Sequence, residues 1–224
     1  MADFLSITNI AFIFLDYSVS YVELIGTLLY FWSVWLISKR RLLTWPVGIV
    51  SVLLYMVLFY QIRLYSDTLE QVYYLGASIY GWIFWNKSAS DIGRVKDVVY
   101  SSRRSIVLWI LVTGIISTLV GIFMVNIHVL LPVYFPDAAS FPFLDGLTTI
   151  MSFTAMWLMA RKRIESWFYW IIVDIIGVWL YFVKDVKFLS LLYVILVVMA
   201  IHGLWSWHQA KTQAVSAQQI YTGS

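Results

Sequence analysis

A single carboxylate interrupts one of the most apolar stretches of the chain. In the run WFYWIIVDIIGVW, residues 167–179, Asp174 stands among aliphatic and aromatic side chains. Trp170 precedes it by four residues and Gly177 follows it by three, so a helix would place all three on one face. An indole face attracts positive charge, and a carboxylate accepts hydrogen bonds strongly, so this face suits a flat ligand that is cationic or rich in hydroxyl groups. The alternative is a hydrogen bond that only joins two packed helices.

A second polar face lies in the run SDTLEQVYYLGASIYGWIFW, residues 66–85. Four side chains recur there at helical spacing, namely Gln71, Tyr74, Ser78 and Trp82. The Gln71 amide both donates and accepts hydrogen bonds, as an amide ligand requires. Glu70 points away from this face and is expected to snorkel or cap near the end of its helix.

The elements that hold these residues are apolar helices. Of the 224 residues, 62% are hydrophobic and 12% are charged, whereas a soluble domain is about half apolar and a quarter charged. Seven apolar runs are long enough, or nearly so, to cross a bilayer as helices. They cover residues 21–38, 45–60, 66–85, 105–126, 143–160, 167–183 and 187–207. The sequence therefore predicts a membrane protein with seven transmembrane helices, preceded by an interfacial segment at 1–20 rather than a cleaved signal peptide.

The charges predict an orientation. If the seven spans alternate, 12 of the 15 Lys and Arg residues fall on one side. These are Lys39, Arg40, Arg41, Lys87, Arg94, Lys96, Arg103, Arg104, Arg161, Lys162, Arg163 and Lys211. Basic residues in short loops stay in the cytoplasm, so the N-terminus is expected outside and the C-terminus inside. Trp45, Trp85, Trp167 and Trp207 are expected to form an aromatic belt at the inner interface.

The chain repeats itself at an offset of 122 residues. The offset pairs Trp35 with Trp157, Trp45 with Trp167, Gly81 with Gly203 and Trp85 with Trp207. Three spans in each copy, separated by one extra span, would leave both copies in the same orientation. The sequence therefore predicts a 3+1+3 arrangement, with repeats at 21–86 and 143–208, a linker helix at 105–126 and a cytoplasmic tail at 209–224. Parallel repeats of this kind are typical of transporters, with a site near the midplane between the halves.

The repeat adds further candidates. Tyr193 of the second copy corresponds to Gln71 of the first, while Tyr30 and Ser152 correspond to each other and are expected to line the path at middle depth. Glu23 and Asp145 stand at the outer starts of matching helices. They are candidates for an outer gate, although acidic residues at a helix N-terminus are also favoured by the helix dipole alone.

Several chemistries are excluded or left without support. The chain has no cysteine, which excludes disulfides, thiolate metal sites and a cysteine nucleophile. It contains no HExxH, GxSxG or P-loop motif, and its three histidines show no ligand spacing. We therefore predict no enzyme, no metal, no cofactor and no nucleic-acid partner.

Particular stretches resemble a known family. The stretch FYQIRLYSDTLEQVYYLGASIYGWIFW at 59–85 resembles the third-span region of the PnuC-type nicotinamide riboside transporters. YVELIGT at 21–27, FPFLDG at 141–146 and the Trp167–Trp170–Asp174 stretch are similar to the same family. The resemblance implies a 3+1+3 fold related to the SWEET sugar transporters, a bacterial inner membrane, and uptake of nicotinamide riboside by facilitated diffusion. It also implies a cytoplasmic kinase that traps the product.

That ligand fits the residues predicted above. Trp170 is expected to stack on the cationic ring, Gln71 to bind the amide or ribose, and Asp174 to attract the cation or accept from ribose hydroxyls. The other candidate substrates are thiamine, another vitamin or a small sugar. A heptahelical receptor, or a membrane enzyme that uses Asp174 and Glu70, is the rival from another class. The expected partners are the small-molecule substrate and membrane lipid, and the sequence leaves open whether copies assemble into a homo-oligomer.

Overall fold

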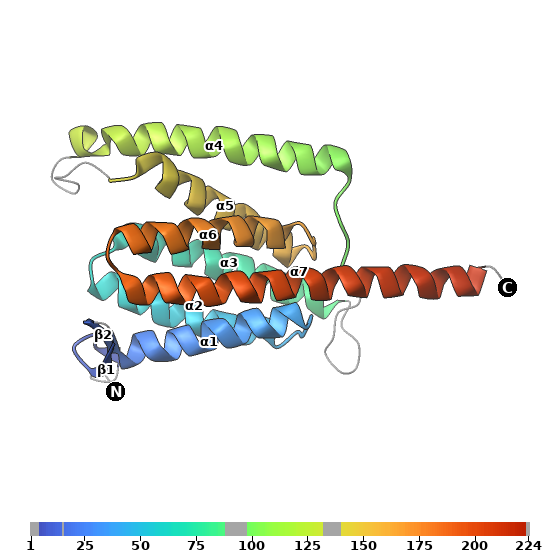
Figure 1. Cartoon of the computed structure of the whole chain (residues 1–224), viewed down its shortest axis with the longest axis horizontal. Coiled ribbons are helices and arrows are strands. Elements are labelled where there is room, and N and C mark those ends of the chain that lie inside the picture. The colour runs from blue at the N-terminus through green and yellow to red at the C-terminus, as the bar shows by residue number, and fades with distance from the viewer. Residues whose placement is uncertain (1–4, 15, 88–97, 132–139, 223–224) are drawn as a thin grey trace.

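The computed structural model describes residues 5–14, 16–87, 98–131 and 140–222. Within these residues a short β-hairpin precedes seven helices (Figure 1). The hairpin pairs β1 (Ile10–Phe14) with β2 (Tyr17–Ser20). The helices are α1 (Tyr21–Ser38), α2 (Thr44–Gln61), α3 (Tyr65–Asn86), α4 (Arg103–Leu130), α5 (Pro142–Ala160), α6 (Ser166–Val183) and α7 (Lys187–Thr222). Each of the seven predicted apolar runs falls within one helix.

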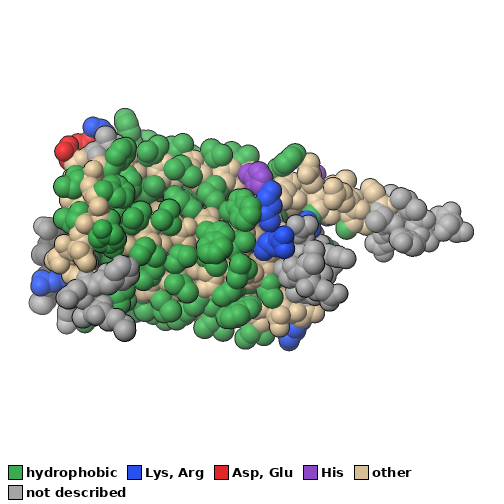
Figure 2. All heavy atoms as spheres, turned by 90° about the horizontal axis from the view of Figure 1, so that it is seen from below, with side chains coloured by type: hydrophobic (Ala, Val, Ile, Leu, Met, Phe, Trp, Pro, Cys, Tyr) green, Lys and Arg blue, Asp and Glu red, His purple; other side chains and the backbone are tan. Residues whose placement is uncertain are grey.

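The surface of the bundle confirms that this is a membrane protein. Six helices of the described chain are long and apolar enough to cross a membrane. The helix missing from that set is α3, because polar residues such as Asp67, Glu70 and Gln71 lower the hydropathy of its first turns. Figure 2 shows hydrophobic side chains covering the middle of one face, with charged side chains toward its ends. A water-soluble protein would hide such a surface.

The helix ends repeat at the same offset as the sequence. After α1, Arg40 adopts a left-handed φ of 56°, and after α5, 122 residues later, Lys162 adopts a φ of 61°. In both turns the left-handed residue donates its amide back into the helix, Arg40 N to Ile37 O and Lys162 N to Met159 O, each at 2.9 Å, and the amide of the following residue also bonds back. Arg63 and Asp185, again 122 apart, end α2 and α6 in the same way. This is the Schellman ending of a helix, here formed without glycine.

Two contacts join elements that are far apart in the sequence. Neighbouring helices pack in chain order from α1 to α3 and from α4 to α7. In addition, α1 packs against α7, and α3 packs against α5. The linker helix α4 packs on α5 at the edge of the bundle (Figure 1). The helix α7 runs well beyond the bundle, so the predicted tail at 209–224 is a continuation of this helix as far as Thr222.

The four tryptophans predicted to form an interfacial belt lie instead in the core, and that prediction was wrong. Trp45, Trp85, Trp167 and Trp207 are at most 2% exposed. Their rings pack edge to face, with centroids 5.3 Å apart for Trp45 and Trp85 and 5.6 Å apart for Trp167 and Trp207. Trp85 donates its indole N–H to Ala160 O at 3.0 Å, and Trp207 donates to Ile37 O at 2.9 Å. We call these four residues the tryptophan quartet. They bind α3 to α5 and α7 to α1 at the basic end of the bundle.

A short segment before α4 crosses this basic end. Val99 N donates to Lys162 O at 3.1 Å, and Ile164 N donates to Val99 O at 3.0 Å. Two residues after Val99, Ser101 N donates to both carboxylate oxygens of Glu165 at 3.2 Å. Val98 is 2% exposed and belongs to the core around the tryptophan quartet. The segment 98–101 is therefore a fixed part of the fold.

Replacing Glu165 should loosen this segment. Glu165 is 5% exposed and Ser101 is partly buried, so Glu165→Ala would leave Ser101 N without its acceptor, at a cost of about 1–3 kcal/mol. We expect faster hydrogen exchange at Ser101 and Val99 and a lower melting temperature. Glu165→Gln retains an acceptor and should retain most of the protection. Equal protection in Glu165→Ala and the parent would contradict the role of this bond.

Candidate functional site

Tyrosines from three helices converge on Asp174 of α6. The carboxylate of Asp174 lies close enough to Tyr30 of α1 and Tyr193 of α7 to interact electrostatically with both. Tyr74 of α3 lies close to both Tyr30 and Tyr193. We call Tyr30, Tyr74, Asp174 and Tyr193 the central cluster. Tyr30, Tyr74 and Asp174 stand eight or nine residues along their helices, about 12–14 Å from the helix starts and so near middle depth.

Asp174 is buried without a donor. Its side chain is 4% exposed, and no residue in the described ranges donates a hydrogen bond to its carboxylate. The structure therefore does not provide the interhelical hydrogen bond that was the alternative explanation of this residue. A buried carboxylate that lacks donors costs folding free energy. An ionisable group in that position inside a membrane protein points to a function.

The position of Tyr193 depends on a glycine next to Asp174. A Cβ atom added to Gly177 would lie 2.3 Å from Cδ1 of Tyr193, so the ring rests directly on the α6 backbone. On α6 itself, Tyr181 stacks on Tyr193 with centroids 5.2 Å apart and planes at 23°. Gly177 lies one turn beyond Asp174, and so the glycine holds the Tyr193 ring close to the carboxylate.

Three of the four residues predicted on the polar face of α3 point into the bundle. Gln71 is 9% exposed and Ser78 is 2% exposed, and Tyr74 belongs to the central cluster. From α5, Ser152 is 7% exposed and lies beside the Tyr74 side chain. The structure thus places side chains with donors and acceptors from α3 and α5 beside the carboxylate of α6.

The two predicted tryptophans differ in their surroundings. Trp82 is 41% exposed on the outside of the bundle, and the structure does not bring it to the central cluster. The reason is its neighbour Gly81, which takes the inward position against the Trp45 ring. Trp170 is partly buried and packs at the edge of two apolar clusters, which contain Met151 and Met159 of α5.

Acidic residues lie between the central cluster and the helix ends opposite the basic end. Thr149 of α5 donates to Glu70 of α3 at 2.9 Å, so Glu70 joins two helices and does not merely snorkel or cap. Asp67 interacts electrostatically with both Glu70 and Asp145, and Tyr181 lies within range of all three carboxylates. Among the residues described, no group of three His, Asp or Glu side chains is arranged to hold a metal ion.

The other gate candidate, Glu23, is held by the hairpin. Tyr17 of β2 donates its hydroxyl to Glu23 at 2.9 Å, and Ser20 caps α1 by accepting from the Glu23 amide at 3.3 Å. Burial, followed by the charge of Glu23, raises the pKa of Tyr17 above its usual value of 10, so the phenol stays protonated as a donor. The Tyr17 ring also stacks on Phe188 of α7 at 5.3 Å. The hairpin thereby connects α1 and α7 at the end of the bundle opposite the basic end.

Sequence reasoning missed one residue beside the central cluster, Tyr55. Tyr55 of α2 shares a hydrogen bond of 2.7 Å with Thr27 of α1 and interacts electrostatically with Tyr30. At the offset of 122, Tyr55 corresponds to Gly177, and Gln71 corresponds to Tyr193. The first repeat therefore has the ring at this pair of positions on its second helix, as Tyr55 of α2. The second repeat has it on its third helix, as Tyr193 of α7. This exchange was visible in the aligned repeats.

A methyl group at Gly177 should disturb the central cluster without unfolding the protein. Gly177→Ala would push the partly buried Tyr193 ring away from α6, because the added Cβ lies 2.3 Å from the ring. We expect at least a tenfold loss of affinity for the bound solute, measured by calorimetry on the purified protein. The matched control is Gly76→Ala on α3, where a Cβ meets nothing within 4 Å. Unchanged affinity in Gly177→Ala would show that the position of Tyr193 does not matter for binding.

Comparison with known proteins identifies the family. Residues 20–209 match the family model described as "Nicotinamide mononucleotide transporter". The chain belongs to this family. It is a family of membrane transporters and not of enzymes.

Individual relatives agree with the family. The chain is 29% identical over 208 residues to the nicotinamide riboside transporter PnuC of Escherichia coli (strain K12), covering 85% of this chain and 86% of the relative. It is 28% identical over 201 residues to the riboflavin/roseoflavin transporter RibM of Streptomyces davaonensis, covering 88% and 89%. The crystal structure of the vitamin B3 transporter PnuC superposes with a TM-score of 0.68 at 21% identity, covering 86% of this chain and 83% of that one. The structural likeness shows a shared fold.

Proposed function

We propose that this protein carries nicotinamide riboside into the cell by facilitated diffusion, with the central cluster as its binding site. The observation that carries the proposal is Asp174, a mid-depth carboxylate that is 4% exposed, lacks a donor from the described residues and faces tyrosines from other helices. Membership of the family and the names of its relatives support this substrate class.

The chemistry of the cluster favours the riboside. Nicotinamide riboside has a flat cationic ring, a carboxamide and a neutral ribose. In the proposal Asp174 attracts the ring or accepts from ribose, Gln71 pairs with the carboxamide, and Trp170 stacks on the ring. Tyr30, Tyr74, Ser78, Ser152 and Tyr193 supply hydroxyl groups, whereas Trp82 is left out because it is exposed. A phosphorylated ligand would bring negative charge next to Asp174, so the mononucleotide should bind more weakly.

Alternating access is the proposed mechanism. In this proposal α1–α3 and α5–α7 form two parallel units, covering residues 21–86 and 143–208, and α4 is the linker. Support comes from the contacts between halves, since the offset of 122 exchanges the α1–α7 contact with the α5–α3 contact. It also comes from the paired left-handed residues at the helix ends. The tryptophan quartet would close the basic end, and the acidic end, with Glu23 and Asp145, would carry the outer gate.

Cellular context completes the proposal. By the distribution of Lys and Arg, the basic end faces the cytoplasm of a bacterial inner membrane, with the N-terminus outside. Of the basic residues used for this orientation, Arg94 and Lys96 lie outside the described residues. Facilitated diffusion only equalises the concentration of the free solute across the membrane. Net uptake therefore continues only while the solute is converted inside the cell, and a cytoplasmic kinase would do this by trapping the product.

Binding and uptake test the proposal together. Calorimetry on the purified protein would compare nicotinamide riboside, its mononucleotide, thiamine, riboflavin and a small sugar. We expect saturable binding of nicotinamide riboside and at least tenfold weaker binding of the mononucleotide. Uptake into sealed vesicles separates a transporter from a receptor, because a receptor binds its ligand without moving it. Binding of another vitamin alone, or binding without uptake, would overturn the proposal.

Riboflavin is the second candidate substrate. The RibM relative has a similar level of identity to this chain as the riboside transporter, 28% against 29%. Riboflavin also has a flat ring and a polyol, which the aromatic and hydroxyl groups of the cluster could hold. It has no positive charge, however, so it leaves Asp174 without a counter-ion. Thiamine, which is a cation, does not share this weakness and is included in the binding experiment for that reason.

A further inference from the structure

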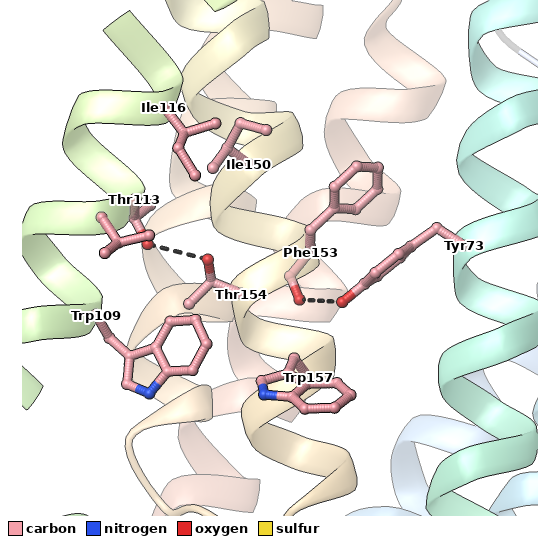
Figure 3. A pocket seen from close by; sticks show the side chains of 9 residues that line it. Tyr73, Trp109, Thr113, Ile116, Ile150, Phe153, Thr154 and Trp157 are labelled. Atoms are coloured by element: carbon pink, nitrogen blue, oxygen red, sulfur yellow. Dashed lines mark hydrogen bonds between the residues drawn. The ribbon is translucent and has the colours of Figure 1, made fainter. Parts of the chain in front are cut away.

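A groove between α3, α4 and α5 opens on the side of the bundle, apart from the central cluster (Figure 3). Its volume is about 290 Å³. Trp109, Thr113 and Ile116 of α4 form one wall, and Ile150, Thr154 and Trp157 of α5 form the other. The rest of α4 carries exposed aliphatic residues such as Ile115, which is 60% exposed. The groove therefore faces the hydrocarbon of the membrane.

The hydroxyl groups in the groove wall are already hydrogen-bonded within the protein. The hydroxyls of Thr113 and Thr154 share a hydrogen bond of 2.9 Å. Tyr73 of α3 donates its hydroxyl to the carbonyl oxygen of Phe153 at 2.8 Å (Figure 3). With these groups satisfied, the wall presents chiefly carbon atoms. An aliphatic chain fits such a surface better than a water-soluble solute, which would need partners for its own polar groups.

A positive charge stands at one end of the groove. The guanidinium of Arg161 lies 5.7 Å from the ring centroid of Trp157, which lines the groove. Arg103 and Arg104 begin α4 at the same end of the bundle. From Arg161 the lining residues of α5 continue to Ile150, eleven residues away, or about 16 Å. That distance is about half of the ~30 Å hydrocarbon layer, and so it corresponds to one leaflet.

We propose that this groove binds one acyl chain of an anionic phospholipid, with the lipid phosphate on Arg161. The groove matches such a lipid both in the position of its positive charge and in its depth in the membrane. A lipid in that leaflet places its chain along Trp157, Thr154 and Ile150 and its head group level with Arg161. Basic pockets between transmembrane helices are a recurring site for anionic head groups. The proposal does not depend on which solute the protein carries.

Occupancy of the groove should stabilise the contact between α3 and α5. Tyr73 and Phe153 line the groove and also join these two helices, through the hydrogen bond and through rings 4.2 Å apart. An acyl chain packed against Tyr73 and Phe153 would stabilise the contact between α3 and α5. Bound lipid is therefore expected to raise the melting temperature of the protein and to slow opening between α3 and α5.

Lipid add-back to the full-length, delipidated protein tests the proposal. Phosphatidylglycerol and phosphatidylcholine would be titrated separately in mixed micelles, with the melting temperature and native mass spectrometry as readouts. We expect a melting temperature several degrees higher with phosphatidylglycerol than with phosphatidylcholine. Arg161→Gln should weaken phosphatidylglycerol binding about fivefold. Lys39→Gln is the matched control, because Lys39 corresponds to Arg161 in the first repeat and α1 does not have α4 packed beside it.

A second pair of variants tests the groove itself. Ile116→Trp would fill space between the walls, whereas Ile115→Trp adds the same bulk to the neighbouring exposed position. We expect the first to abolish the stabilisation by phosphatidylglycerol and the second to leave it intact. Equal stabilisation by both lipids, or an Arg161→Gln variant that behaves like Lys39→Gln, would overturn the charge assignment. If Ile116→Trp instead dissociates an oligomer, a second copy of the chain occupies the groove and the lipid proposal is wrong.

Discussion

Asp174→Ala is expected to lower the affinity for the transported solute by about 100-fold or more while raising the melting temperature of the empty protein. The two effects have one cause. The carboxylate is 4% exposed and receives no hydrogen bond from the described residues, so its burial costs folding free energy that alanine does not incur. When solute binds, the same carboxylate gains its partner, and a hydrogen bond to a charged group contributes roughly 1.5–3 kcal/mol, with loss of the ionic attraction in addition.

Asp174→Asn separates the two roles of the side chain. Asparagine retains hydrogen bonding and removes the charge. If hydrogen bonding to the ribose dominates, affinity should stay within about tenfold of the parent; if attraction to the cationic ring dominates, the loss should approach that of alanine. The matched control is Asp185→Asn, which removes a carboxylate whose side chain is 80% exposed and paired with Lys187 at 3.1 Å. Normal transport by Asp174→Ala would remove Asp174 from the proposed site.

Most of the fold could be predicted from the sequence because lipid-facing helices have to be apolar along their whole length. Each predicted run falls inside an observed helix, and the turn residues Arg40 and Lys162 repeat at the predicted offset. The hairpin was not predicted as such, since its two strands are only five and four residues long. The end of α7 was also missed. Hydropathy marks where a helix leaves the membrane, but QAKTQAVSAQQ contains no glycine or proline to end it.

The candidate site was less predictable, because sequence periodicity shows which residues share a helix face but not which other helix that face contacts. Asp174, Tyr74 and Gln71 were found from their helix faces, but the contact of α1 with α7 depends on tertiary packing. Trp82 shares the predicted face with Gln71 and is nevertheless exposed, because Gly81 beside it receives the Trp45 ring. The tryptophan quartet illustrates the same limit. Tryptophan near a helix end is ordinarily interfacial, and the glycines that receive the rings of Trp45 and Trp167 stand on other helices, far from them in the sequence.

The repeated glycines that receive those rings give the largest expected effect on stability. A Cβ on Gly81 would lie 2.3 Å from Cη2 of Trp45, and a Cβ on Gly203 would lie 2.4 Å from Cη2 of Trp167. Both rings are at most 2% exposed, so neither can swing aside. Their indole N–H groups find no acceptor in the described chain, which means that packing alone holds them in place. Overpacking of this kind costs about 1–3 kcal/mol or more.

We therefore expect Gly81→Ala and Gly203→Ala each to lower the melting temperature by roughly 5–10 °C, since 1 kcal/mol corresponds to about 2–4 °C in a protein of this size. The controls are Gly76→Ala and Gly114→Ala, whose added Cβ atoms meet nothing within 4 Å. In a helix that exchange should be neutral or stabilising by up to about 1 kcal/mol. The same substitution is thus expected to lower the melting temperature where a tryptophan ring packs on the glycine, and to leave it unchanged or raise it where the space beside the glycine is open. If all four variants shifted the melting temperature alike, the close packing of Trp45 and Trp167 on glycine would be refuted. If only one of Gly81→Ala and Gly203→Ala were destabilising, the two halves would not share this packing as they share their sequence.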